Sequence, residues 1–96
     1  MRAIIKAPGH PASRVIIPNE LELFQQLVGG FIEIFPIASD CVILCDEEGK
    51  RKGKPFNCNF CGEDFVGTIL FVGVDGDEFT DVPVAALEAL EEGRLV

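Results

Sequence analysis

The stretch PNELELFQQLVGGFIEIFP, residues 18–36, constrains the fold more than any other part of this sequence. Its first half repeats apolar residues at the spacing of one helical face, at Leu21, Phe24, Leu27 and Val28. Asn19 is a favourable N-cap, and Glu22 three positions later completes a capping-box pattern. Gly29 and Gly30 predict the end of the helix, because glycine enters the left-handed cap conformation without a steric cost.

The residues after the glycine pair predict a strand. Phe31–Phe35 alternates side chains between two faces, and Pro36 closes the segment. Ile32 and Ile34 share one face, whereas Glu33 lies between two phenylalanines on the other and is expected to be partly buried. A desolvated carboxylate has a raised pKa and can act as a general acid or base. The alternative is an ion pair with a base of the N-terminal segment: Arg2, Lys6 or Arg14.

The rest of the chain predicts further short strands and one more helix. The expected strands are Arg2–Ala7, Ser13–Ile17, Cys41–Cys45 and Gly67–Val74, and the expected helix is Pro83–Glu92, capped by Thr80 or Asp81. The order β-β-α-β-β-loop-β-α predicts one α+β domain over residues 1–96, with a mostly antiparallel sheet of about five strands.

Several of these strands are apolar on both faces, so both faces of the sheet need cover. We expect the first helix to cover one face. The other face requires the long loop, the last helix or a second subunit. A symmetric homodimer would bury it, and self-association is therefore one expectation.

Composition narrows the classes of partner and compartment. A formal net charge of −8 argues against a surface built for nucleic acid or for an anionic membrane. No apolar run is long enough to span a bilayer, and the first ten residues lack the apolar core of a secretory signal. We therefore expect a cytoplasmic protein with no nucleic-acid or membrane partner.

Residues 46–64, DEEGKRKGKPFNCNFCGED, show little periodicity and predict a long loop. A long loop in a small domain is usually functional or mobile. Half of the basic residues of the chain fall within it: Lys50, Arg51, Lys52 and Lys54. Such a cluster between glycines can hold a phosphate or a nucleotide, although no phosphate-loop frame is present. The alternative is a solvated hairpin tip whose charges compensate one another.

The four cysteines leave a metal site open. Cys58 and Cys61 have the spacing that places two thiolates on one zinc ion, and Cys45, Cys41 and His10 are the candidates for further ligands. Cys41 and Cys45 would lie about 13 Å apart on an extended strand, so they cannot both bind that ion. The alternative is that Cys41 and Cys45 are small core residues and the other two are a thiol pair in the loop. A redox role is disfavoured, because no helix is expected to start at the pair.

Three segments, in this order and spacing, carry a family resemblance: LVGGFIEIFP, DEEGKRKGKPFN and VGTILFVGVDGDEF. Together they resemble the domain of unknown function 3846 family, small uncharacterised proteins of bacteria, phages and mobile elements. The resemblance covers nearly the whole chain and implies no established reaction. The Cys58-x-x-Cys61 insertion departs from the family pattern, so a metal role would belong to a subset of the family.

The sequence contains no Ser-His-Asp set, paired carboxylate motif or HExxH helix, so we do not expect an enzyme. We expect a non-catalytic protein-binding module whose partner is a host or phage protein. The alternative is a domain that uses loop 46–64 to bind a small ligand, such as a nucleotide or phosphate, or zinc. The expected contact residues lie in that loop, apart from the last: Lys50, Arg51, Lys54, Phe56, Asn57 and Glu33. Asn57 has a local alternative as a turn-former.

Overall fold

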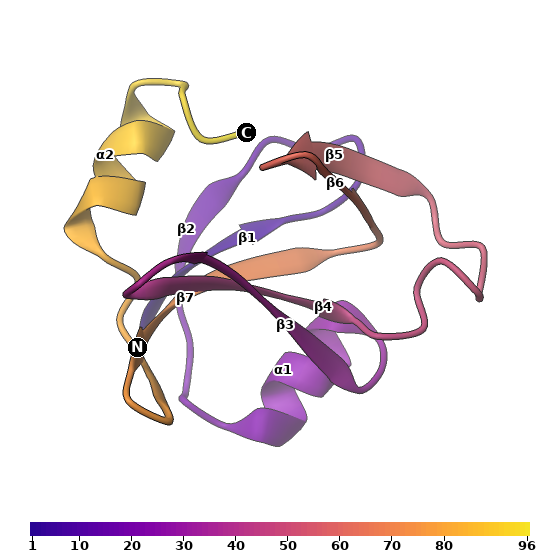
Figure 1. Ribbon diagram of the computed structural model, residues 1–96, viewed down its shortest axis with the longest axis horizontal. Coiled ribbons are helices and arrows are strands. Elements are labelled where there is room, and N and C mark those ends of the chain that lie inside the picture. Colours follow the sequence, from indigo (N-terminus) through magenta and orange to yellow (C-terminus); the bar gives the residue numbers. More distant parts are fainter.

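The computed structural model describes residues 1–96 as a six-stranded sheet, a separate two-stranded hairpin and two helices (Figure 1). In chain order the elements are β1 (Arg2–Lys6), β2 (Ser13–Ile16), α1 (Leu21–Val28), β3 (Ile32–Ala38), β4 (Cys41–Asp46), β5 (Phe56–Phe60), β6 (Glu63–Val66), β7 (Ile69–Asp75), β8 (Glu78–Thr80) and α2 (Val84–Glu91). All strand pairs are antiparallel. The predicted α+β class is confirmed, with more strands than expected.

The main sheet has the strand order β2-β1-β7-β4-β3, and β8 pairs with the end of β7. The β1–β2 and β3–β4 pairs are hairpins, each made of two predicted strands that follow each other along the chain. β7 is the strongest predicted strand, and it lies between β1 and β4, where its first five residues are buried. The most apolar segment therefore takes a central position, and β2 and β3 form the edges.

Helix α1 covers one face of the sheet, as predicted. Phe24 and Val28 are its buried residues. They belong to one core cluster with residues of β1, β4 and β7: Ala3, Val42, Leu44, Leu70 and Val72. The predicted apolar stripe of the helix is therefore the stripe that faces the sheet.

The β5–β6 hairpin and α2 cover the opposite face (Figure 1). Phe65 of β6 meets Phe35 of β3 edge-on, with ring centroids 5.3 Å apart. Phe60 of β5 meets Phe71 of β7 in the same manner at 5.6 Å, and Leu87 of α2 is buried in this second cluster. The hairpin and α2 of the same chain therefore cover this face. A second subunit was one of the expected sources of that cover.

The predicted capping box at the start of α1 is wrong. The N-cap residue is Glu20, and no side chain caps the helix. The amide of Asn19 instead donates to the carbonyl oxygen of Phe79 at 2.8 Å, which ties the segment before α1 to β8. Asn19 therefore uses its side-chain nitrogen in a tertiary hydrogen bond, and its oxygen caps no helix N–H.

The predicted cap of the last helix is also wrong, because Pro83 is the N-cap residue of α2. Asp81 instead accepts the backbone N–H of Arg2 at 2.7 Å, and its carboxylate forms an ion pair with the side chain of the same arginine. These bonds fasten the chain before α2 to the start of β1. Neither helix is long and apolar enough to cross a membrane.

Two predicted boundaries differ from the structure. Pro36 does not close β3, because the strand continues to Ala38 with a register shift after the proline. Residues 46–64 are not one loop, because β5 and the first half of β6 lie within the second half of this range. Turns and irregular backbone join the end of β4 at Asp46 to the start of β5 at Phe56, and a second turn at Cys61-Gly62 joins β5 to β6.

Candidate functional site

The two glycines after α1 have different structural roles. Gly29 ends the helix in the left-handed conformation, with a φ of 84°, and its N–H donates to the carbonyl oxygen of Gln25. This position confirms the predicted helix stop. At Gly30 the requirement is space, because a Cβ atom there would lie 2.5 Å from Oδ1 of Asp46. The end of α1 is therefore packed closely against the end of β4.

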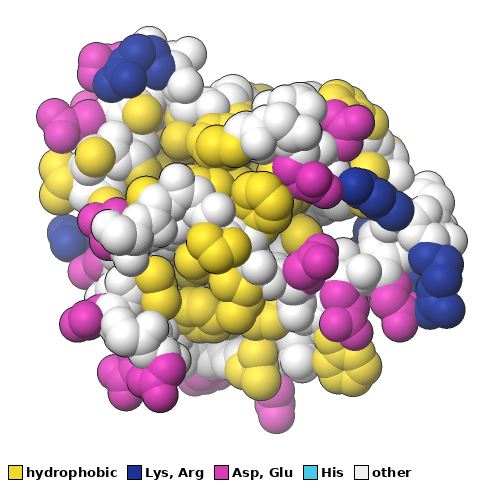
Figure 2. All heavy atoms as spheres, in the orientation of Figure 1, with side chains coloured by type: hydrophobic (Ala, Val, Ile, Leu, Met, Phe, Trp, Pro, Cys, Tyr) yellow, Lys and Arg dark blue, Asp and Glu magenta, His cyan; other side chains and the backbone are white.

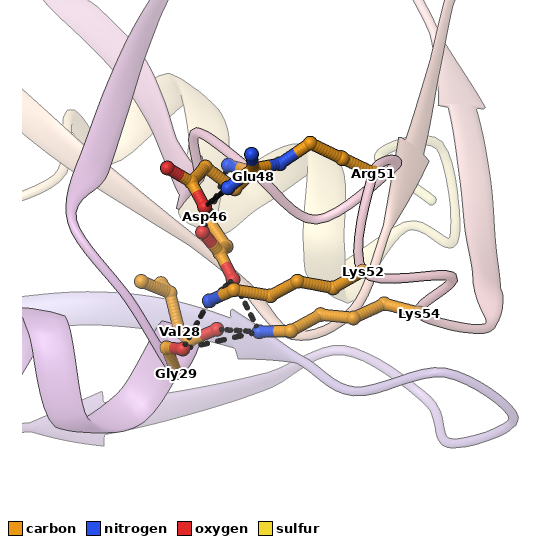
Figure 3. Close-up of polar contacts among 7 residues, drawn as sticks. All are labelled: Val28, Gly29, Asp46, Glu48, Arg51, Lys52 and Lys54. Atoms are coloured by element: carbon orange, nitrogen blue, oxygen red, sulfur yellow. Dashed lines mark hydrogen bonds and ion pairs between the residues drawn. The ribbon is translucent and has the colours of Figure 1, made fainter.

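Asp46, the last residue of β4, is a buried carboxylate held by two lysines (Figure 3). Its side chain is 1% exposed, and its Oδ2 atom lies 2.8 Å from Nζ of Lys52 and 2.7 Å from Nζ of Lys54. Its Oδ1 atom accepts the N–H of Glu48 at 2.9 Å. Burial alone would raise the pKa of Asp46, but these hydrogen bonds outweigh burial and hold the pKa well below its ordinary value. The carboxylate is therefore ionised at neutral pH.

The same two lysines bond the carbonyl groups at the end of α1 (Figure 3). Nζ of Lys54 donates to the oxygen of Val28 at 2.7 Å, and Nζ of Lys52 donates to the oxygen of Gly29 at 3.1 Å. Positive charge is favourable here, because the last carbonyl groups carry the negative end of the helix dipole. We call Asp46, Lys52 and Lys54 with these carbonyl groups the lysine bridge.

The other two bases of the loop are paired at the surface. Nζ of Lys50 lies 3.0 Å from Oε1 of Glu63, with the lysine side chain 63% exposed. Arg51 pairs with Glu48 three residues earlier. Every base of residues 46–64 thus has a carboxylate partner. This arrangement agrees with the charge-compensated alternative and leaves no unpaired cation for a phosphate.

A cavity of about 420 Å³ lies between β3, the end of β4 and β6. Its lining combines the aromatic residues Phe35 and Phe65 with the carboxylates Glu33, Glu47, Glu63 and Asp64. Asp46 also lines it, and the only lining cation is Lys50, already paired with Glu63. Figure 2 shows acidic side chains gathered on this part of the surface, beside a band of hydrophobic side chains. We call this cavity the acidic pocket.

Of the carboxylates in the acidic pocket, only Glu33 was expected as a functional residue from the sequence. It is exposed rather than partly buried. None of its expected basic partners forms an ion pair with it: Arg2 is paired with Asp81, Arg14 with Glu91, and Lys6 donates to the oxygen of Ala7. The remaining acids lie at the two ends of the predicted loop, and only the β5–β6 hairpin fold brings them beside Glu33. A sequence signal for this grouping was therefore absent.

The buried thiols of the sheet are core residues. Burial raises the pKa of Cys41 to about 11, and burial together with the neighbouring Glu33 carboxylate raises the pKa of Cys45 to about 11. Sγ of Cys45 lies 3.8 Å from Oε2 of Glu33, at the acidic pocket. The thiolate is the nucleophilic form of cysteine, so a thiol held protonated at neutral pH is a poor nucleophile.

The Cys58-x-x-Cys61 pair does not form a zinc knuckle. Cys58 lies within β5, and Cys61 lies in the turn that follows it, with a φ of 51°. No group of three or more His, Cys, Asp or Glu side chains is placed to hold a metal ion. The expected zinc ligands Cys58, Cys61 and Cys45 are therefore not brought together.

Asn57 is a buried residue that fixes the hairpin to the main sheet. Its amide donates to the oxygen of Lys6 at 2.9 Å and to the oxygen of Gly67 at 2.7 Å. Its Oδ1 atom is buried without a hydrogen-bond partner. Asn57 is thus neither a surface contact nor a turn-former. The preceding Phe56 is 59% exposed and remains available to a partner.

Comparison with known proteins gives one match. A family model described as a domain of unknown function, DUF3846, matches residues 1–93. No curated protein and no solved structure matches the chain. The matched range includes both helices and all strands, and with them the lysine bridge and the acidic pocket. The chain therefore belongs to the DUF3846 family.

Proposed function

We propose that this chain is a non-catalytic protein-binding module that takes a positively charged segment of its partner into the acidic pocket. The observation that carries this proposal is the pocket itself, a concave site of about 420 Å³ lined by acidic and aromatic side chains. The chain as a whole has a formal net charge of −8, so its field also attracts a basic partner.

The chemistry of the pocket suits a lysine or arginine side chain. Two unit charges about 4 Å apart attract by about 4 kcal/mol at the effective dielectric constant of a protein surface, and by about 1 kcal/mol in bulk water. A half-enclosed cavity lies between these limits. Phe35 and Phe65 add aromatic surface for the apolar stem or for a guanidinium plane.

The alternative ligands have less support. A phosphate or nucleotide needs available cations, but Lys52 and Lys54 are held in the lysine bridge, and the pocket beside them is acidic. A zinc ion needs convergent ligands, and the cysteines do not converge. The protonated state of Cys45 supports a binding role over nucleophilic chemistry in the pocket. The expectation of a host or phage partner rests on the family resemblance alone.

Fluorescence polarisation with a labelled lysine- and arginine-rich peptide tests the proposal. One variant neutralises three pocket carboxylates by changes to the amide: Glu33→Gln, Glu47→Gln and Asp64→Asn. Glu63 is kept, because its removal would release Lys50. The matched control neutralises three exposed acids elsewhere: Glu20→Gln, Glu22→Gln and Asp77→Asn. We expect about tenfold weaker binding for the pocket variant, a loss of about 1.4 kcal/mol, and little change for the control. Equal losses in both variants would show that only the net charge matters.

A further inference from the structure

The outer edge of β3 has no strand partner, because β3 ends the strand order and pairs only with β4. The oxygen of Phe31 accepts the N–H of Glu47 at 2.9 Å, so the backbone groups of Phe31 point toward β4. Bonding alternates along an antiparallel pair, so Glu33 also bonds toward β4. The N–H and C=O groups of Ile32 and Ile34 therefore point outward and lack a partner strand.

Pro36 marks the end of this open edge. It is the next residue with an outward-pointing nitrogen, so its missing N–H removes no bond to β4. A register shift follows it at Ile37. Prolines and bulges are the features that natural edge strands use to block further pairing. β3 is thus blocked after Phe35 and open along Ile32–Phe35.

The two faces beside the open edge differ in chemistry. Glu33 and Phe35 line the acidic pocket. Ile34 is paired with Leu44, which packs beneath α1, so Ile34 lies on the opposite face and is 49% exposed. A strand added beside β3 would place its side chains alternately beside the pocket and beside exposed aliphatic surface.

We propose that the partner segment binds as an additional strand along Ile32–Phe35, with a basic side chain opposite Glu33 and apolar side chains opposite Ile32 and Ile34. This inference rests on the function proposed above and specifies the form of the ligand. Residues directly opposite each other on neighbouring strands point to the same face. The recognised pattern is therefore apolar–basic–apolar in an extended conformation, a known mode of peptide recognition at sheet edges.

Charge favours this occupant over a second copy of the chain. Pairing of two β3 edges would bring together two chains that each carry a formal net charge of −8, with the acidic pockets close to the shared edge. Like charges on facing strands are destabilising, whereas opposite charges are stabilising. A basic segment of another protein can pair its backbone with the open edge of β3 and its positive charge with the acidic pocket.

Three labelled peptides separate strand addition from charge attraction alone. The first alternates, Val-Lys-Val-Lys-Val, the second has the same composition in the order Val-Val-Lys-Lys-Val, and the third is Val-Glu-Val-Glu-Val. We expect the alternating basic peptide to bind about tenfold more tightly than the reordered one, and the acidic peptide to show no binding. Hydrogen exchange of the Ile32 and Ile34 amides should slow in the complex with the first peptide.

Ile34→Pro tests the edge directly. The substitution removes an outward N–H and places a ring in the path of the added strand, while the bonds to β4 remain. Ile16→Pro is the matched control on the other edge. The Met1–Ile17 bonds place the N–H of Ile16 outward from β2. We expect Ile34→Pro to lose about tenfold in affinity for the alternating peptide and Ile16→Pro to bind it as the parent does, with both folds checked by circular dichroism.

A charge exchange gives a second readout should Ile34→Pro fail to fold. Glu33→Lys should bind Val-Glu-Val-Glu-Val and lose the basic peptide. If the alternating and reordered peptides bind equally and amide exchange is unchanged, the proposal of strand addition is wrong. The acidic pocket would then still be the proposed binding site. Failure of every basic peptide to bind the parent would overturn the proposed function as well.

Discussion

Replacing Lys54 by Met should lower the free energy of unfolding by about 2–3 kcal/mol, because it removes the ammonium group of the lysine bridge and keeps the length of the side chain. A hydrogen bond to a charged group contributes about 1.5–3 kcal/mol, and a cation at a helix C-terminus contributes about 0.3–1 kcal/mol. Nζ of Lys54 makes bonds of both kinds, to Asp46 and to Val28 at 2.7 Å each, and a longer one to the oxygen of Gly29 at 3.5 Å. Lys52 still pairs with the carboxylate in the variant, so the loss stays below the 3–5 kcal/mol, roughly, of a broken buried ion pair.

Urea and thermal unfolding followed by far-UV circular dichroism measure this loss. Fluorescence is unsuitable, because the chain has no Trp and no Tyr. For a domain of this size each 1 kcal/mol shifts the melting temperature by about 4–8 °C, so we expect a decrease of about 10–20 °C. The matched control is Lys50→Met, which removes an exposed ion pair with Glu63 and should lower the melting temperature far less, because exposed ion pairs contribute little to stability.

A double-mutant cycle assigns the effect to the contact with Asp46. Lys54→Met and Asp46→Asn should be less than additive, with an interaction energy of about 1–3 kcal/mol, since both remove the same ion pair. Equal losses for Lys54→Met and Lys50→Met would refute the reasoning. Full additivity in the cycle would show that Lys54 stabilises the fold through the helix end alone.

Further predictions concern the same region and the thiols. Gly30→Ala should cost about 1–3 kcal/mol, because its Cβ would overlap the Asp46 carboxylate; an unchanged melting temperature would show that the loop moves aside. The pKa of Asp46 is lower in the folded than in the unfolded state, so its contribution to stability is present above about pH 4 and is lost as the pH falls further. The stability difference between parent and Asp46→Asn should therefore shrink on acidification, and a constant difference in urea midpoints would contradict this. At pH 8, Ellman's reagent should modify exposed Cys61 quickly, and buried Cys41, with its pKa raised to about 11, only after unfolding; equal rates would contradict the buried position.

Local patterns in the sequence predicted the elements that depend on neighbouring residues or on a strongly periodic spacing of apolar residues. The apolar spacing of α1 and the left-handed Gly29 depend on residues within two helical turns, and both are confirmed. The β1–β2 and β3–β4 hairpins are likewise pairs of neighbouring apolar segments. Asn19 shows the limit of this reasoning. Its side-chain oxygen was expected to accept a helix N–H, but the observed bond is donated by its side-chain nitrogen to Phe79, a long-range partner that the sequence does not reveal.

The sequence did not predict the β5–β6 hairpin, because its strand pattern and its turn residues are each weak indications of a hairpin. The segment FNCNF alternates with a period of two, but it is five residues long and lies between charged and glycine-rich stretches. Its turn is Cys61-Gly62, with φ values of 51° and 78°, rather than the Asn-Gly or Asp-Gly pair that usually indicates such a turn. The acidic pocket depends on this hairpin, so the sequence could not predict the pocket either.

The four bases between β4 and β5 are conspicuous in the sequence, but each is paired with a carboxylate in the structure, and the pocket beside them is acidic. Lys50 is the only cation that lines the acidic pocket, and its partner Glu63 lines it too. Lys50→Met should therefore strengthen the binding of a basic peptide, because it removes a like charge and releases a carboxylate. The charge of Lys50 is exposed and screened by solvent, so we expect the dissociation constant to fall only severalfold, and only at low salt. Weaker binding of the basic peptide to Lys50→Met, measured by titration calorimetry with the fold intact, would contradict the role of Lys50 as a competing charge in the pocket.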